Sequence, residues 1–455
     1  MVDTIITANG QNMTNLDDLR RRHMCWTAGE TCYFLLSSNS TAQAKTLFKT
    51  TDGFSEIAVI NRPDVSPNVT EVGDIGNSEE MTKVDMFYDG WAGHDGGLIH
   101  FVFWNTDDDE VQYQNLDTSD DCFSAIVTVA SYDGDGTNID PWSNTPSNND
   151  RYAVTICRAT GGTLCLLMKD HTNNYFWSSA NDGATWVAGT APSNSAGGWY
   201  ELWPSGTGGT HCVLLEHDKG DDDFFIRTGV VTIVIAGVVH SASWGTRIQI
   251  NDASNTFIQN VYSQHNITLC YGATFDPDND RLWLVGQTKF NNAVADMDIF
   301  KIDVSTNPPT VDDRSDGSGS LARIWENQDE SAHPYITLVQ STGDLYVWFQ
   351  EAATLRTSGG GGDMFYMKSD DDGASWGSAV DISSEDGDID YMIGCPLIET
   401  SVGGRVLIAW WADNTASGLV NDWVVNKSTS IAIAAAAAGI SVPVAMHHYT
   451  KTIGA

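Results

Sequence analysis

The residues best suited to chemistry in this chain are its aspartates, which gather in short loops. Positions 133 to 140 read DGDGTNID and place Asp133, Asp135 and Asp140 in one glycine-containing segment. Aspartates at alternate positions with glycine between them allow several oxygen atoms to converge on one Ca²⁺ ion. The segment lacks the closing glutamate of an EF-hand loop, and a solvated Asp/Gly turn explains the same residues. Calcium is therefore the only cofactor that the sequence suggests, with a plain turn as the alternative.

Paired carboxylates, which most glycoside hydrolases use as acid and base or nucleophile, are the second chemistry to consider. The chain has 47 Asp and 13 Glu, so a pair of acids can be found in almost any region. The runs at 107–110 and 221–223 are interpreted as hydrated surface, because like charges repel and stay solvated. Composition therefore singles out no catalytic pair.

Two eight-residue segments share an unusual pattern, and a third is a weaker copy. Residues 179–186 read SANDGATW, residues 369–376 read SDDDGASW, and residues 50–57 read TTDGFSEI. The third-position Asp or Asn can accept hydrogen bonds from its own turn, glycine permits a left-handed backbone, and tryptophan covers apolar area. We expect a structural role for the positions Thr50, Asp52, Ser179, Asn181, Gly183, Trp186, Ser369, Asp371, Gly373 and Trp376.

These segments resemble the Asp-box, or BNR repeat, of sialidase-like β-propellers. The resemblance implies a propeller whose boxes lie on the rim, away from a central site. It also implies three arginines that grip a carboxylate, a tyrosine nucleophile activated by glutamate, and an aspartate acid/base.

The arginines match that constellation poorly. The early family arginine follows an aromatic residue in a strand, whereas the nearest segment here is Asn61-Arg62-Pro63. Arg20 to Arg22 are expected to form one surface cluster. The remaining candidates are Arg151, Arg158, Arg281, Arg323 and Arg405. We therefore expect a protein without sialidase activity.

Composition excludes several classes of protein. The 455 residues carry a net charge of −37, which excludes a general nucleic-acid binder because phosphate neutralisation needs clustered Lys and Arg. Aromatic and β-branched residues are too plentiful for a disordered chain. The abundance of Asp, Asn, Gly, Ser and Thr argues against long helices and favours tight turns.

A repeated pattern of strand, tight turn, strand and third strand runs along the chain. Its turns lie at Gly29, Gly97, Gly162, Gly208, Asn279, Gly343 and Gly404. One small sheet cannot bury both of its faces, but a ring of twisted sheets can. We predict an all-β fold, a β-propeller of seven blades, with six or eight as alternatives.

The chain is divided into three parts by this pattern. Residues 1–22 form an N-terminal segment, in which Asp3 to Ala8 supplies a closing strand to the last blade or anchors a neighbouring subunit. Residues 23–430 form the propeller, and residues 431–455 a docking segment, helical over 431–438 and extended afterwards. The N-terminus lacks the pattern of a secretion signal, and the apolar run from Ile431 is short for a membrane span.

The cysteines and tryptophans favour core roles. None of the eight cysteines forms a CxxC pair, so a zinc site is not expected. The pairs Cys25/Cys32 and Cys157/Cys165 each flank a turn and are expected to face each other across a hairpin. Some tryptophans could stack on sugars, but we expect inter-blade packing for Trp91, Trp203, Trp348, Trp410 and Trp411.

These observations favour a non-enzymatic structural or recognition propeller. We expect a virion component, such as a tail or capsid-surface protein, that mediates assembly or attachment to a host surface; an extracellular location is the alternative. Its expected partners are other virion proteins or its own subunits through residues 431–455, and a host glycan. The alternative functions are a sialidase-like glycoside hydrolase, which predicts arginine, tyrosine and glutamate converging at the propeller axis, and a glycan-binding module.

Overall fold

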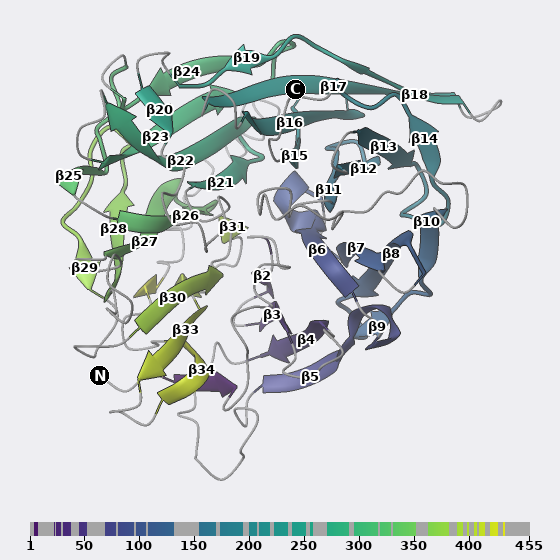
Figure 1. Cartoon of the computed structure of the whole chain (residues 1–455), viewed down its shortest axis with the longest axis horizontal. Coiled ribbons are helices and arrows are strands. Elements are labelled where there is room, and N and C mark those ends of the chain that lie inside the picture. Colours follow the sequence, from purple (N-terminus) through teal and green to yellow (C-terminus); the bar gives the residue numbers. More distant parts are fainter. Residues whose placement is uncertain are drawn as a thin grey trace, which may run out of the picture.

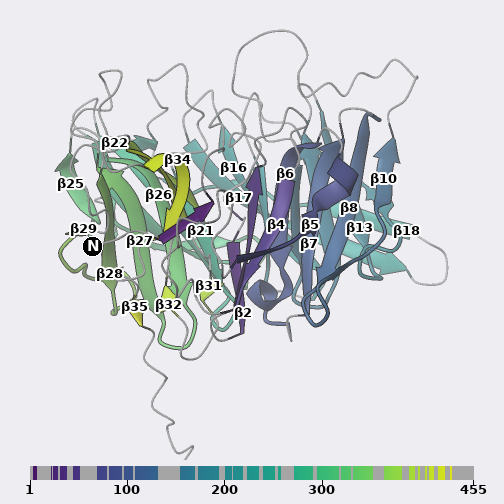
Figure 2. The same ribbon diagram turned by 90° about the horizontal axis from the view of Figure 1, so that it is seen from below.

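The computed structural model describes the chain as a ring of antiparallel sheets arranged around a central axis (Figure 1). The described residues are 4–7, 22, 24–28, 31–37, 45–51, 69–78, 81–94, 97–105, 108–131, 154–169, 173–193, 200–206, 209–218, 223–234, 239–251, 255–257, 271–290, 295–316, 319–328, 331–351, 363–381, 389–394, 398–399, 405–406, 409–414, 419–425 and 431–432. Figure 2 shows the sheets standing side by side, with their strands running along the axis.

Six sheets are described with the side chains of most of their strands and form six successive blades. The first blade holds β2 (Met24–Ala28), β3 (Thr31–Ser37), β4 (Lys45–Thr50) and β5 (Val69–Asp74). The second holds β6 (Met81–Tyr88), β7 (Leu98–Asn105), β8 (Glu110–Asp117), β9 (Cys122–Phe123) and β10 (Val127–Ser131). The third holds β11 (Val154–Arg158), β12 (Leu164–Lys169), β13 (Asn174–Ser179) and β14 (Val187–Gly189). Two short 3₁₀ helices, η2 (Ile75–Ser78) and η3 (Asp89–Ala92), flank β6.

The next three blades follow the same order. The fourth blade holds β15 (Tyr200–Pro204), β16 (His211–Asp218), β17 (Asp223–Val234), β18 (Val239–Trp244) and β19 (Ile248–Gln249). The fifth holds β20 (Asn255–Phe257), β21 (Tyr271–Asp276), β22 (Arg281–Phe290), β23 (Ala295–Asp303), β24 (Thr310–Arg314) and β25 (Trp325–Gln328). The sixth holds β26 (Ser331–Val339), β27 (Asp344–Glu351), β28 (Asp363–Ser369), β29 (Val380–Asp381) and β31 (Ile398–Glu399).

A further four-stranded sheet closes the ring between the last and the first of these blades (Figure 1). It consists of β30 (Ile389–Gly394), β33 (Ala409–Asn414), β34 (Leu419–Val425) and β1 (Thr4–Thr7), and is described through its backbone pairing. β1 pairs antiparallel with β34, with Thr4 opposite Val425, so a segment from the start of the chain forms the outer strand of this sheet. The all-β propeller expected from the sequence is confirmed. Six blades are described with side chains, a number that was expected from the sequence as an alternative to seven. The sheet of β30, β33, β34 and β1 lies where a seventh blade was expected.

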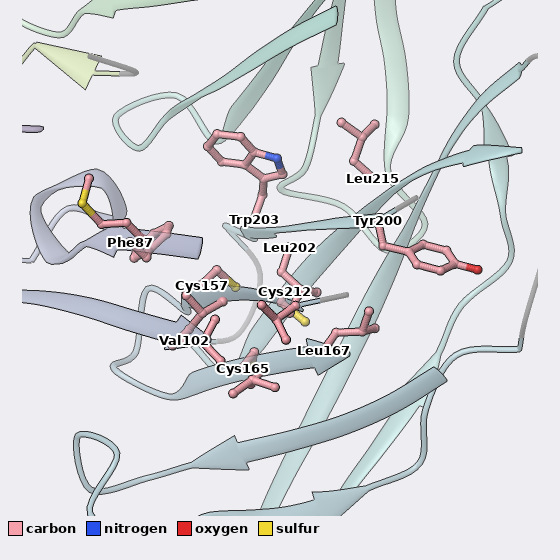
Figure 3. Close-up of a cluster of buried hydrophobic side chains, with 14 of the residues drawn as sticks. Phe87, Val102, Cys157, Cys165, Leu167, Tyr200, Leu202, Trp203, Cys212 and Leu215 are labelled. Carbon is pink, nitrogen blue, oxygen red and sulfur yellow. The ribbon is translucent and has the colours of Figure 1, made fainter. Parts of the chain in front are cut away.

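Apolar residues on both faces of the sheets explain why the blades stack. Every residue of β12 is buried, and β7 is buried from Ile99 to Asn105, because each blade is covered by a neighbour on both sides. Figure 3 shows part of the core shared by the second, third and fourth blades, with side chains from β6, β7, β11, β12, β15 and β16. Trp91, Trp203 and Trp348 are all buried, so the expected core role of these three is confirmed. Trp410 and Trp411 lie in β33, whose side chains are not described.

Two sequence expectations are corrected by the strand pairing. Cys157 does face Cys165 across β11 and β12, but Cys25 faces Tyr33, and Trp26 faces Cys32. The register shifts between Trp26 and Ala28, so symmetric spacing about the turn does not align the two cysteines. Residues 431–432 form β35 (Ile431–Ala432), which pairs with β32 (Arg405–Val406), so the expected helix over 431–438 is wrong at its start. Residues 433–455 lie outside the described part. No helix in the described part is long and apolar enough to cross a membrane.

Candidate functional site

Polar side chains interrupt the apolar innermost strands of three neighbouring blades. Asp85 lies in β6, Thr155 in β11 and Glu201 in β15, and all three are buried. An innermost strand has no partner strand on its axis side, so its backbone groups there need other partners. Asp85 Oδ2 accepts the N–H of Ile156 at 2.9 Å, and Thr155 Oγ1 accepts the N–H of Leu202 at 3.1 Å. These side chains therefore tie each inner strand to the next.

Arg22 joins these polar side chains into one site. Its guanidinium donates to both carboxylate oxygens of Asp85, with Nε at 3.2 Å from Oδ1 and Nη2 against Oδ2. Nη1 donates to the carbonyl oxygen of Leu202 at 2.9 Å, and Nη2 donates to Thr155 Oγ1 at 2.8 Å. Nε also lies 3.4 Å from Glu201 Oε1. The residue just before the first blade thus binds the inner strands of the second, third and fourth blades.

Two aromatic rings complete the surroundings of Arg22. Its guanidinium carbon lies 5.6 Å from the ring centre of Phe87 and 5.1 Å from that of Trp203, both within cation–π range. We call this set the Arg22 cage; it consists of Asp85, Phe87, Thr155, Glu201, Leu202 and Trp203.

Charge balance explains how Arg22 is tolerated at 1% exposure. Burial opposes the charged guanidinium, but the attraction of Asp85 and Glu201 outweighs that cost and raises the pKa of Arg22 above its ordinary value. The sequence expectation that Arg20 to Arg22 form a surface cluster is therefore wrong for Arg22. Arg20 and Arg21 lie outside the described residues.

Arginine, glutamate and tyrosine converge at this site, as the sialidase alternative predicts. The hydroxyl of Tyr271, on β21, donates to Glu201 Oε2 at 3.5 Å. However, Arg22 is engaged by two acids of the same chain rather than left for a substrate carboxylate. Tyr271 and Glu201 are each 3% exposed, so within the described residues the pair lies beneath the surface.

The arginine candidates from the sequence are not brought together in the described part. Arg281 pairs with Asp303 and Asp312 on its own blade, at 3.0 and 2.9 Å. Arg323 pairs with Asp296 and Asp298, at 2.5 and 3.3 Å. Only the backbone of Arg405 is described, and Arg62 and Arg151 lie outside the described residues.

Arg158 belongs to a second buried network, between the second and third blades. His100 Nε2 lies 2.7 Å from Asp89 Oδ1, and its Nδ1 lies 2.6 Å from the hydroxyl of Tyr113. Arg158 bridges Asp89 and Asp182, at 2.5 and 2.6 Å. Burial would raise the pKa of Asp89, but the hydrogen bonds and charges of His100 and Arg158 hold it below its ordinary value. His100 and Tyr113 are at most 1% exposed. This chain of acid, imidazole and phenol lies in the second blade and is joined to the third by Arg158 and by the Tyr113 hydroxyl, which donates to the carbonyl oxygen of Asp182 at 3.1 Å.

The two full octapeptides form turns with the same hydrogen bonds. Each opens with a serine that accepts from the glycine N–H, Ser179 Oγ from Gly183 at 3.0 Å and Ser369 Oγ from Gly373 at 2.9 Å. The third-position oxygen accepts the N–H four residues on, Asn181 from Thr185 at 3.0 Å and Asp371 from Ser375 at 2.8 Å. Asn181 replaces aspartate without loss because one oxygen suffices for this bond.

These turns pack against aromatic residues of the preceding blade. Trp186 meets Tyr113 edge-on, with ring centres 5.2 Å apart, and an added Cβ at Gly373 would lie 3.5 Å from Trp283. Trp376 Nε1 donates to the carbonyl oxygen of Ala322 at 3.2 Å. In the weaker third copy Thr50 is buried at the end of β4, while Asp52 lies outside the described residues.

The third-position carboxylate of the Ser369 turn, residues 369–376, should respond to acid, whereas the third-position amide of the Ser179 turn, residues 179–186, does not titrate. Hydrogen bonds from the hydroxyl and N–H of Ser375, and from Ser369, hold the pKa of Asp371 below its ordinary value. Stability from this carboxylate is therefore present above the unfolded pKa of about 3.9 and is lost as pH falls through the lower folded value. Asp371→Asn should flatten the fall of melting temperature between pH 5 and 2.5. Asn181→Asp should steepen it; identical pH profiles for all three proteins would contradict this.

The candidate calcium ligands Asp133, Asp135 and Asp140 lie outside the described residues. Within the described part, no three or more His, Cys, Asp or Glu side chains are arranged to hold a metal ion. Calcium therefore stays a sequence expectation.

No family model and no curated protein matches this chain. Among solved structures it is similar to an ulvan lyase, a polysaccharide lyase, with a TM-score of 0.47 and 8% identity over 93% of this chain and 95% of that one. It is also similar to hydrazine synthase from Kuenenia stuttgartiensis, with a TM-score of 0.45 and 13% identity over 94% and 98%. An arabinanase from Bacillus subtilis has a TM-score of 0.29 and 15% identity over 60% and 92%. At these scores the similarities carry no functional argument.

Proposed function

We propose that this chain is a non-enzymatic β-propeller of the Asp-box type, serving as a structural or recognition module in a larger assembly. The observation that carries the proposal is the Arg22 cage. The acids Asp85 and Glu201 are engaged by an arginine of the same chain. A carboxylate-gripping or two-acid catalytic site would need these groups free to meet a substrate.

The turns at Ser179 and Ser369 support the Asp-box assignment through their hydrogen bonds. In both, serine and the third-position residue satisfy backbone N–H groups within the turn, and the turn packs on the preceding blade. Their exposed acidic residues are explained by turn chemistry. We infer a rim role for them, distinct from any ligand site.

The assembly we favour is a virion, in which this propeller is a tail or capsid-surface protein that contacts other subunits or a host glycan. The support is the composition of the segment from residue 431 onward, which is apolar and would be a liability if exposed to water. Size-exclusion chromatography with light scattering, combined with a glycan array, tests the recognition role. Self-association or glycan binding supports it, whereas a monomer that binds neither itself nor any glycan contradicts it.

A sialidase-like glycoside hydrolase is the second candidate, favoured by one specific contact. Tyr271 donates to Glu201 beside the guanidinium of Arg22, which brings together three residue types that sialidase chemistry uses. For this candidate to hold, the cage would have to open to a substrate. Release of sialic acid from a fluorogenic sialoside, lost in Tyr271→Phe, would favour it over the structural role.

A further inference from the structure

The walls of the Arg22 cage are held in place by contacts that do not involve Arg22. Asp85 Oδ1 accepts the N–H of Met86 at 3.0 Å, and Oδ2 accepts that of Ile156. Thr155 is held by the N–H of Leu202. Phe87 and Trp203 are fully buried in the main hydrophobic core (Figure 3). The cage is therefore shaped by three blades, each held by its own hairpins.

The chemistry of the cage is matched to a guanidinium rather than to an ammonium. Acceptors lie opposite each of its three nitrogen atoms: Asp85 and Glu201 at Nε, Leu202 at Nη1, and Asp85 with Thr155 at Nη2. The carboxylate of Asp85 is engaged by two nitrogens at once, which a single ammonium cannot reproduce with the same geometry. Two aromatic rings within 6 Å of the guanidinium carbon favour the flat, delocalised cation further.

We propose that the centre of the ring is a guanidinium-binding site, which Arg22 fills in this structure and which accepts a guanidinium from solution or from another chain when residue 22 does not supply one. The site goes beyond the proposed function, because it assigns a ligand class to groups that otherwise only join the blades. Arg22 reaches it as a single side chain at the end of the segment that leads into β2. Every other atom described at the site comes from the blades.

The test is rescue of Arg22→Ala by methylguanidinium, measured as melting temperature at millimolar concentrations far below denaturing ones. A ligand at ten times its Kd raises the folded-to-unfolded ratio about 11-fold, so the melting temperature should begin to rise near Kd and then increase with the logarithm of the concentration. Methylammonium at the same ionic strength should give no such rise. N-acetylarginine amide serves as a second arm, because a response to it shows that the site also admits an arginine side chain from another molecule.

Two control variants make the result specific to this site. Arg323→Ala removes an arginine that also pairs with two acids, Asp296 and Asp298, but on a single blade and without the aromatic walls described for Arg22. It should not respond, and neither should the double variant Arg22→Ala with Asp85→Asn.

If Arg22→Ala does not fold on its own, the recovery of soluble protein on refolding with and without methylguanidinium replaces the melting curve. Equal responses of Arg22→Ala and Arg323→Ala, or no response of Arg22→Ala in either measurement, would overturn the proposal. Glycan turnover by the wild type that persists in Glu201→Gln would overturn the proposed function and leave this site untouched.

Discussion

Replacing Arg22 by methionine is expected to lower the free energy of unfolding by about 3–5 kcal/mol, the cost of removing one partner from a buried ion pair. Methionine keeps most of the apolar stem, so the loss comes from two buried acids, Asp85 and Glu201, left without their cation. Chemical denaturation followed by tryptophan fluorescence measures the effect, because Trp203 lies against the guanidinium.

Neutralising the two acids is the matched control for this prediction. In the triple variant Arg22→Met, Asp85→Asn, Glu201→Gln, neither acid of the cage carries a charge any longer, and the amide oxygen introduced by Asp85→Asn can still accept the N–H of Ile156. We expect this protein to be more stable than Arg22→Met alone, although it contains more substitutions. A loss below about 1 kcal/mol for Arg22→Met would show that the guanidinium contributes no more than an exposed ion pair does.

The second large effect is expected at Gly183, where two nearly identical turns allow a matched comparison. Gly183 and Gly373 have φ angles of +83° and +80°, so alanine at either position costs roughly 1–2 kcal/mol in backbone strain. An added Cβ would lie 2.0 Å from Tyr113 at position 183, but 3.5 Å from Trp283 at position 373. Gly183→Ala should therefore cost about 1–3 kcal/mol more than Gly373→Ala, as overpacking does.

The extra loss at Gly183 should arise at the boundary between the second and third blades. Tyr113 cannot move away without loosening its 2.6 Å contact with His100. A further substitution of Tyr113 by leucine should remove most of the difference between the two alanine variants. Equal melting temperatures for Gly183→Ala and Gly373→Ala would mean that the turn does not press against the neighbouring blade.

The propeller could be predicted from the sequence because its causes are local and repeated. A tight turn between two apolar strands, as at Gly162 and Gly343, indicates directly which strands of a blade pair, and both glycines have positive φ angles. The octapeptide turns were equally accessible, since the hydrogen bonds from the serine and third-position side chains that shape each turn join residues at most four positions apart.

The central site could not be predicted, because it joins residues that are distant along the chain. Arg22 meets Thr155 and Leu202 across 133 and 180 positions, and its neighbours Arg20 and Arg21 make it look like one member of a surface cluster. One signal did exist. Asp85 and Glu201 each lie inside an apolar inner strand, in Val-Asp-Met and Tyr-Glu-Leu, and a buried acid requires a buried cation. The prediction that Cys25 and Cys32 face each other was wrong for a related reason, because spacing about a turn does not reveal a local shift in strand register.

Turnover of acidic glycans is the measurement that tests the central claim most directly. Wild-type protein and Glu201→Gln should be incubated with sialosides and with uronic-acid polysaccharides, and products followed by mass spectrometry. If the polar groups of the Arg22 cage are held by Arg22 and do not meet substrate, neither protein will release product faster than a control reaction that contains no protein. Product release by the wild type that is abolished in Glu201→Gln would contradict the account, since it would place the axis acids in a working catalytic site.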